Sequence, residues 1–162
     1  LSFLKPESGD VTWGYESISH PSSLKKFVSY IPQEPVIFGK SVMENILLQA
    51  DKQENLDEKK LSSILDLCQI SNFCTLDDLH SQLNIDKLSG GQKQRIGLAR
   101  ALISNPEYLI IDEGFSGIDH NSTKDLIQSL KKLDSIKGML LISHNEKLKE
   151  CFDKIIYINE LK

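Results

Sequence analysis

The stretch that decides the fold is residues 88–95, which read Leu88-Ser89-Gly90-Gly91-Gln92-Lys93-Gln94-Arg95. A Ser-Gly-Gly turn precedes an apolar stripe at helical spacing, formed by Ile96, Ala99, Leu102 and Ile103. The first N–H groups of a helix have no partner inside the helix, and two glycines let the backbone approach an anion closely. The stretch therefore predicts a helix over residues 89–104 whose N-terminus suits a phosphate. A plain helix start after a flexible turn is the alternative interpretation.

Apolar runs on either side of this helix predict a parallel α/β core. Residues 27–31, 108–111, 139–142 and 155–158 read as strands, and the runs at 108–111 and 139–142 are typical of strands buried on both faces. A helical pattern around Leu126 separates those two runs, as in a strand–helix–strand unit. Further helices are predicted near residues 41–50, after a Ser41–Glu44 capping box, and near 61–68. We therefore expect an α/β core at about 1–38 and 105–162, with a helical insertion at about 39–104.

Two adjacent carboxylates, Asp112 and Glu113, follow the 108–111 strand. Ligands of parallel sheets bind beyond the carboxyl ends of the strands. Because the chain turns at such an end, both carboxylates can reach one site. A solvated acidic strand end is the alternative interpretation.

Other polar residues stand at equivalent places along the chain. Gln33 follows the 27–31 strand, and His144 follows the 139–142 strand. Asp119 precedes the helix around Leu126, where it is also a plausible N-cap. Each residue is weak evidence alone, because most surface glutamines and single histidines are solvated or structural.

Taken together and in this order, the motifs resemble those of the ATP-binding cassette (ABC) family. Residues 88–95 match its signature motif, Asp112 and Glu113 its Walker B motif, and Gln33 its Q-loop. The resemblance covers essentially all 162 residues, and residues 32–46 resemble the exporter branch. It implies a P-loop NTPase-like parallel sheet with a helical subdomain. Residues 77–87 depart from the exporter pattern, which weakens the case for exporter-type contact with a membrane domain there.

The resemblance also implies a role for each residue. Asp112 and Gln33 would hold Mg²⁺, Glu113 would polarise the attacking water, and His144 would contact the γ-phosphate of ATP. Asp119 would belong to the D-loop. The signature residues Ser89, Gly90, Gly91 and Gln92 would contact ATP held by a second nucleotide-binding domain.

The implied partners are that second domain, identical or different, and a transmembrane domain at the cytoplasmic face of the cell membrane. ATP would close the pair of domains and hydrolysis would reopen it, which drives transport. The net charge of −4 gives no support for a broad nucleic-acid surface, so no nucleic acid is expected as a partner. Three cysteines without a C-x-x-C pattern favour unpaired thiols.

No G-x-x-x-x-G-K-[ST] phosphate loop occurs in the sequence. The segment Gly39-Lys40-Ser41 is not one, because position 34 holds glutamate where the motif needs glycine. Residues 1–8 resemble the segment that follows the phosphate-loop helix, so we expect an N-terminally truncated domain. Two alternatives stay open: a half-site that donates only its signature motif to a partner ATPase, and a soluble ABC ATPase of DNA repair.

We predict that the 162-residue chain by itself binds Mg-ATP weakly and hydrolyses essentially none. The reason is the missing phosphate loop, whose N–H groups and lysine hold the phosphates in this family. Calorimetry and a phosphate-release assay on the purified chain measure both properties. Mg²⁺-dependent turnover that Glu113→Ala abolishes would contradict the prediction.

Overall fold

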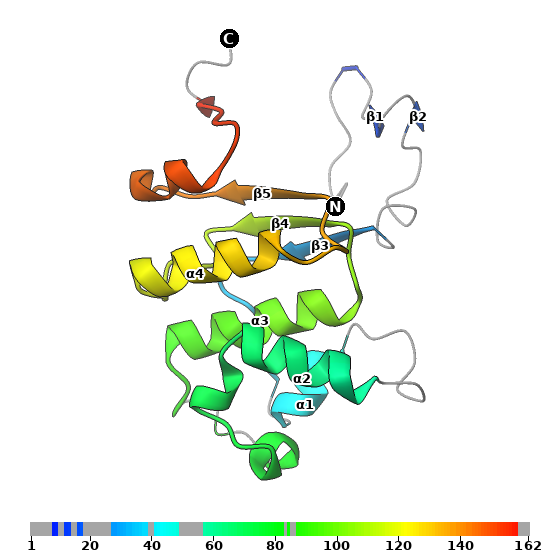
Figure 1. Cartoon of the computed structure of the whole chain (residues 1–162), viewed down its shortest axis with the longest axis vertical. Helices are drawn as coiled ribbons and strands as arrows, with labels where there is room; N and C mark the ends of the chain where they lie inside the picture. The colour runs from blue at the N-terminus through cyan, green and yellow to red at the C-terminus, as the bar shows by residue number, and fades with distance from the viewer. Residues whose placement is uncertain are drawn as a thin grey trace.

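The computed structural model describes residues 8–9, 12–13, 16–17, 27–38, 41–48, 57–82, 84 and 87–158. Its centre is a parallel sheet of β3 (Val28–Ile31), β4 (Tyr108–Asp112) and β5 (Gly138–Ile142), in the order β3-β4-β5 (Figure 1). The register pairs Ile31 with Ile111, and Asp112 with Ile142. The α/β fold class predicted from the sequence is confirmed.

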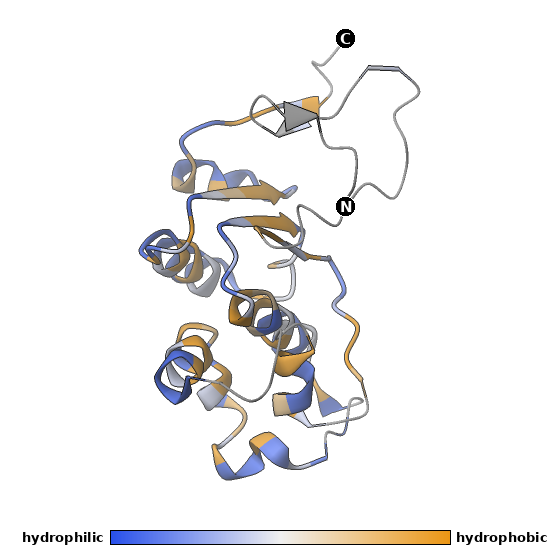
Figure 2. Cartoon of the chain, turned by 90° about the vertical axis from the view of Figure 1, so that its right-hand side faces the viewer, coloured by the Kyte–Doolittle hydropathy of each residue, from blue (hydrophilic) through white to orange (hydrophobic). Residues whose placement is uncertain are grey.

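One face of this sheet packs into the hydrophobic core. Alternate strand residues point to the same face, and the buried set contains Ile31, Leu109 and Ile111. It joins the buried faces of α3 (Gly90–Ile103) and α4 (His120–Lys131) in one cluster. Figure 2 shows both helices running beside the strands.

The opposite face of the sheet is more open. Leu140 is 51% exposed and Ile142 is 40% exposed. For the part of the chain that the structure describes, the prediction that the strand at 139–142 is buried on both faces is therefore wrong, whereas every residue of β4 is buried or partly buried. Among the described residues, helices cover one face of the sheet, and the apolar run of β5 lies at its edge.

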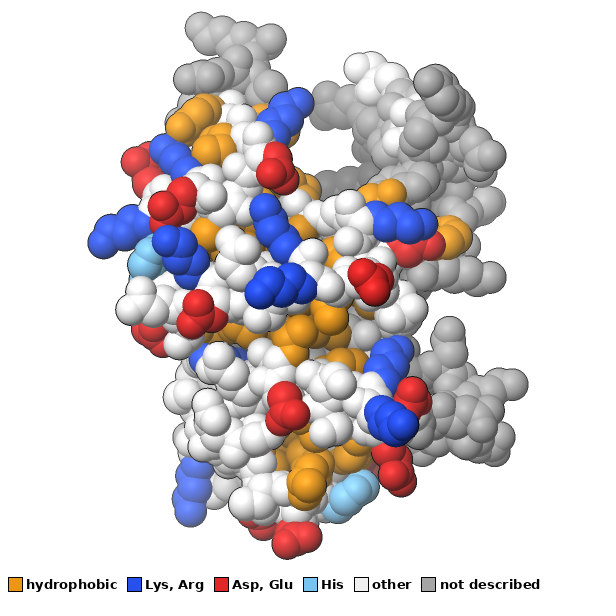
Figure 3. Space-filling model, in the orientation of Figure 1, with side chains coloured by type: hydrophobic (Ala, Val, Ile, Leu, Met, Phe, Trp, Pro, Cys, Tyr) orange, Lys and Arg blue, Asp and Glu red, His pale blue; other side chains and the backbone are white. Residues whose placement is uncertain are grey.

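A helical layer lies on the far side of α3 from the sheet (Figure 1). It contains α1 (Val42–Leu47), α2 (Glu58–Leu67) and the short 3-10 helices η3 (Ile70–Asn72) and η4 (Asp77–His80). The predicted capping box at the start of α1 is confirmed, since Ser41 and Glu44 each accept a hydrogen bond from the other's backbone N–H. On the face drawn in Figure 3, acidic and basic side chains are interspersed, with apolar side chains between the sheet half and the helical half.

The insertion bounds of about 39 and 104 stay a prediction, and residues 39–40 lie outside the described part. So do residues 1–7, on which most of the resemblance at the start of the chain rests. The described pieces there include a short antiparallel pair, β1 (Thr12–Trp13) and β2 (Glu16–Ser17).

The predicted strand at 155–158 is not formed. After the 3-10 helix η6 (Glu146–Cys151), residues 155–157 have no assigned secondary structure and no ladder pairing, and Ile158 is 73% exposed. A strand requires a neighbour for its backbone N–H and C=O groups, and no described segment pairs with this run. Cys68, Cys74 and Cys151 are unpaired, as predicted. No described helix has both the length and the apolar character needed to cross a membrane.

Candidate functional site

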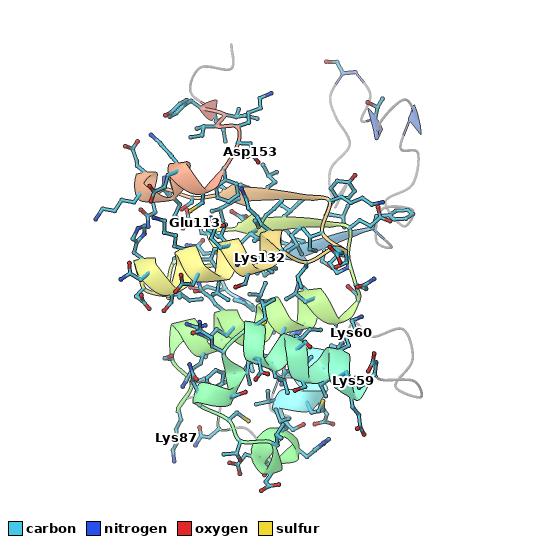
Figure 4. The ribbon with its side chains drawn as sticks, in the orientation of Figure 1. Lys59, Lys60, Lys87, Glu113, Lys132 and Asp153 are labelled. Carbon is cyan, nitrogen blue, oxygen red and sulfur yellow. The ribbon has the colours of Figure 1, made fainter. Side chains whose placement is uncertain are left out.

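Glu113 lies at the centre of a group of polar side chains that follow the ends of the three described parallel strands. Gln33, after β3, donates through Nε2 to Oε2 of Glu113 at 3.0 Å. His144, after β5, places Nε2 3.1 Å from Oε1 of Glu113. Figure 4 shows Glu113 at the edge where the strands end. Three residues that the sequence placed at strand ends therefore meet around one carboxylate.

The backbone of Glu113 adopts an uncommon conformation. Its φ is +49°, in the left-handed region that non-glycine residues rarely occupy. Its N–H donates to the carbonyl of Ile142 at 2.9 Å, and its own carbonyl accepts from the N–H of Ser116 at 3.0 Å. These bonds hold the carboxylate where β4 turns away from the sheet. Local strain of this kind is concentrated at functional sites.

Asp112 has a different partner from Glu113. The hydroxyl of Tyr30, on β3, donates to Oδ2 of Asp112 at 2.9 Å. This hydrogen bond to the carboxylate raises the pKa of Tyr30 above its ordinary value. Sequence reasoning missed Tyr30, although the register offers a signal: Tyr30 pairs with Ile110, whose side chain shares a face with that of Asp112 two residues on.

The signature residues form the first turn of α3. Ser89 is its N-cap: Ser89 Oγ accepts from the N–H of Gln92 at 3.2 Å, while Gln92 Oε1 accepts from the N–H of Ser89 at 2.9 Å. The side chain of Gln92 therefore takes part in a capping box. Gly90 faces open space, since a Cβ added there would meet nothing within 4 Å.

Gly91 has a packing role that the sequence did not indicate. A Cβ added at Gly91 would lie 2.5 Å from the carbonyl oxygen of Gly117. The start of α3 thus touches the turn that follows β4. Asp119 ends that turn as the N-cap of α4, as predicted: it accepts from the N–H of Ser122 at 3.0 Å. Hydrogen bonds from the Ser122 side chain and backbone lower the pKa of Asp119.

Two clefts adjoin these residues. One of about 430 Å³ lies between the segment 33–35, the start of α3 and the turn at 116–117. A second of about 260 Å³ is lined by Glu113, His144 and the start of η6. The predicted site residues are thus gathered along one edge of the molecule, where the strand ends meet the N-terminus of α3.

The arrangement is suited to orienting a water molecule and an anion. Glu113 offers a carboxylate that a neutral amide and an imidazole fix in position, as a water-positioning group requires. No group of three or more acidic, histidine or cysteine ligands occurs among the described residues. Asp112 nevertheless offers a carboxylate, and Gln33 a side-chain carbonyl oxygen, of the oxygen-donor kind that Mg²⁺ binds; this cation uses one or two carboxylates and takes its other ligands from phosphates and water.

The match to known sequences agrees with this geometry. A family model described as ABC transporter matches residues 1–116 of the chain. The chain belongs to the ABC transporter family. This ABC chain therefore contains Gln33, the signature turn, the Asp112–Glu113 pair and His144 in the order along the sequence that the resemblance implied.

Curated relatives share about a third of their aligned residues with this chain. A putative export ATP-binding/permease protein of Rickettsia prowazekii (strain Madrid E) is 34% identical over 170 residues, which cover 99% of this chain and 28% of the relative. The lactococcin-A transport/processing ATP-binding protein LcnC of Lactococcus lactis subsp. lactis is 33% identical over 168 residues, covering 100% and 23%. The chain spans about a quarter of the length of these relatives.

A solved structure shares the fold. A bacterial Atm1-family ABC exporter with ATP bound aligns over 90% of this chain and 26% of its own, with a TM-score of 0.77 at 22% identity. At that identity, the likeness shows the ABC fold alone.

We predict that replacing the two signature glycines of this ABC chain has unequal effects on the free energy of unfolding. Gly91→Ala should lower the free energy of unfolding by about 1–3 kcal/mol, because its Cβ would collide with the backbone of Gly117. Gly90→Ala, which meets open space, should change it by less than about 0.5 kcal/mol. Urea unfolding of both variants measures the difference. Equal stability would mean that α3 and the 116–117 turn are not in backbone contact.

Proposed function

We propose that this chain is part of the ATP-binding and ATP-hydrolysing domain of an ABC exporter, in which nucleotide-driven pairing of two such domains powers transport across a membrane. The observation that carries the proposal is the Gln33–Glu113–His144 group at three adjacent strand ends. The relatives named for export and the ABC exporter fold support it.

Glu113 is the general base in this proposal. Its carboxylate would polarise the water that attacks the γ-phosphate, and the amide of Gln33 would keep that carboxylate from rotating away. His144 is 95% exposed at its side chain, so it can swing onto an incoming phosphate. Phosphoryl transfer depends mainly on positioning and on electrostatic stabilisation, and this group supplies the positioning.

Asp112 and Gln33 are the proposed Mg²⁺ ligands. Bound Mg²⁺ neutralises the charge that develops on the phosphate oxygens. The Nε2 atom of Gln33 is engaged with Glu113, so the side-chain oxygen Oε1 of Gln33 is the atom suited to the cation. Tyr30 fixes the carboxylate of Asp112 by one oxygen, which leaves the other for the metal.

The signature turn would serve a second nucleotide-binding domain. The exposed Gly90, with no atom near its would-be Cβ, leaves room for a phosphate beside the α3 N-terminus. Ser89 already accepts a bond from the N–H of Gln92 through Oγ, so its hydroxyl hydrogen is available to an acceptor. A partner ATP would therefore meet one hydroxyl donor and the N–H groups of the first turn.

Glu113→Gln in the complete polypeptide should reduce ATP hydrolysis by about 100-fold or more, the scale of a lost general base. ATP binding should persist, because the amide keeps the shape of the side chain and removes a negative charge near the γ-phosphate. ATP should then hold the two domains together. Phosphate release, nucleotide binding and crosslinking of the pair measure these effects.

Glu107→Gln is a matched control for that experiment. Glu107 stands at the opposite end of β4 and pairs with Lys137 at 2.6 Å, away from the strand ends that form the site. Its replacement should leave turnover unchanged. Near-normal turnover of the Glu113 variant would reject Glu113 as the base.

The segment 36–38 offers a surface for the transmembrane partner. Val36 is 64% exposed and Phe38 is 46% exposed, so Phe38 does not belong to the buried core. Asn45 fixes Phe38 by bonding both its N–H and its carbonyl. Arg100 donates to the carbonyl of Val36 and lies 5.9 Å from the Phe38 ring centroid. A rigidly held, exposed aromatic residue is typical of a docking contact.

Phe38→Glu should abolish transport and substrate-stimulated ATPase activity in the complete transporter while the basal ATPase activity remains. A carboxylate taken out of water at the contact costs several kcal/mol, whereas in the uncoupled domain it stays on the surface beside Arg100. Transport assays and basal ATPase rates separate the two effects. Leu76→Glu, at another exposed apolar residue of the helical layer, is the control. Unchanged transport in the Phe38 variant would refute the docking surface.

A further inference from the structure

Gln94 is a buried polar residue for which the proposed mechanism gives no role. It lies in the second turn of α3 and is only 5% exposed. Most glutamines lie at the surface, and a buried amide must find hydrogen-bond partners within the protein. The partners of Gln94 are therefore a guide to its purpose.

The Gln94 amide joins three segments of the chain. Its Nε2 donates to the carbonyl of Gln33 at 3.2 Å and to Oγ of Ser116 at 3.0 Å. Its Oε1 accepts from the N–H of Gly117 at 2.9 Å. Both amide hydrogens are thus used, and so is the carbonyl oxygen. One side chain links α3 to the segment after β3 and to the turn after β4.

Two residues that Gln94 contacts, Gln33 and Ser116, also form hydrogen bonds with Glu113. Gln94 holds the backbone of Gln33, whose side chain donates to Glu113. It also holds the side chain of Ser116, whose backbone N–H donates to the carbonyl of Glu113. Gln94 therefore holds two of the residues that contact Glu113, Gln33 and Ser116.

The contact between α3 and the 116–117 turn is also the site of the close backbone approach at Gly91. A backbone contact without directional bonds permits sliding, whereas hydrogen bonds on both loops fix the register between them. The Gln94 amide therefore ties the start of α3 to both loops.

We propose that Gln94 is a positioning residue that sets the Gln33–Glu113 geometry and links it to the signature turn of the same chain. The inference rests on the proposed function, because it assigns Gln94 a role in that hydrolysis. Misplacing a reacting group by about 1 Å can lower a rate by about 100-fold, so loss of the amide should act on the chemical step. ATP affinity should change little, since the Gln94 amide is only 5% exposed and is fully engaged with Gln33, Ser116 and Gly117.

The principal variant is Gln94→Glu in the complete transporter. The carboxylate keeps the shape of the side chain and still accepts from Gly117, but it cannot donate to the carbonyl of Gln33. We expect kcat to fall by about 10- to 100-fold, with the KM for ATP within about threefold of the parent. A fall in kcat/KM that arises from KM alone would overturn the proposal.

A double-mutant cycle separates positioning from loss of stability. If Gln94 acts through Gln33, then Gln94→Glu should have little further effect on kcat in a Gln33→Ala background. Leu98→Ala, at a buried apolar position of the same helix, is the matched control for stability. It should lower the melting temperature but leave kcat per folded molecule unchanged in both backgrounds. Fully additive effects of Gln94→Glu and Gln33→Ala would overturn the proposal.

A second variant decides the matter should Gln94→Glu fail to fold. Ser116→Ala removes one bond to Gln94 from an exposed residue, so folding should be preserved. It should reduce kcat by a smaller factor and show the same non-additivity with Gln33→Ala. A parental kcat for Ser116→Ala would then overturn the proposal. Glu113→Gln serves as the reference. If Glu113→Gln does not reduce turnover, the proposed function itself fails. If Glu113→Gln reduces turnover but the Gln94 and Ser116 variants do not, only the role of Gln94 is rejected.

Discussion

The site depends on the parallel pairing of β3, β4 and β5. In a parallel sheet all the carboxyl ends meet at one edge, and the register here brings Ile31, Ile111 and Leu141 level with one another. Residues 33, 113 and 144 are far apart in the sequence, yet each follows its strand by only one or two positions. Hydrogen bonding between strands, rather than any contact among the side chains themselves, gathers them at one point.

The helices add the second half of the arrangement. The N-terminus of α3 faces the same edge as the strand ends because Gly91 and Gly117 allow their backbones to touch. The capping box of Ser89 and Gln92 fixes where the helix begins. The start of α3 and the Glu113 carboxylate are thus held together by one backbone contact. In the proposed function, this contact lets a single chain contribute to two different nucleotide sites.

Features with local signals could be predicted from the sequence. The start of α1 follows from the Ser41–Glu44 capping box, and the start of α3 from Ser89. The strand ends at Gln33, Glu113 and His144 follow from apolar runs that stop at polar residues. The roles of these residues and the insertion bounds stay predictions, since neither the fold nor the comparisons test them.

Features that depend on non-local partners were missed. The run at 155–158 has the composition of a strand. A strand forms only when it pairs with another strand, and the local sequence does not identify a pairing strand. The contacts Tyr30–Asp112 and Gln94–Gln33 join residues 82 and 61 positions apart, so no short sequence motif predicts them. Gly91 was assigned to anion approach, whereas its lack of a side chain also serves packing against Gly117.

In the proposed function, the left-handed backbone of Glu113 places stability and activity in opposition at one position. A side chain in that conformation costs about 1–2 kcal/mol relative to glycine. Selection for thermal stability alone would therefore favour glycine or asparagine at residue 113 and erase the carboxylate. A glutamate that persists there in a descendant lineage is then a sign of continued catalytic demand, and its loss would mark a domain free to become a purely structural partner.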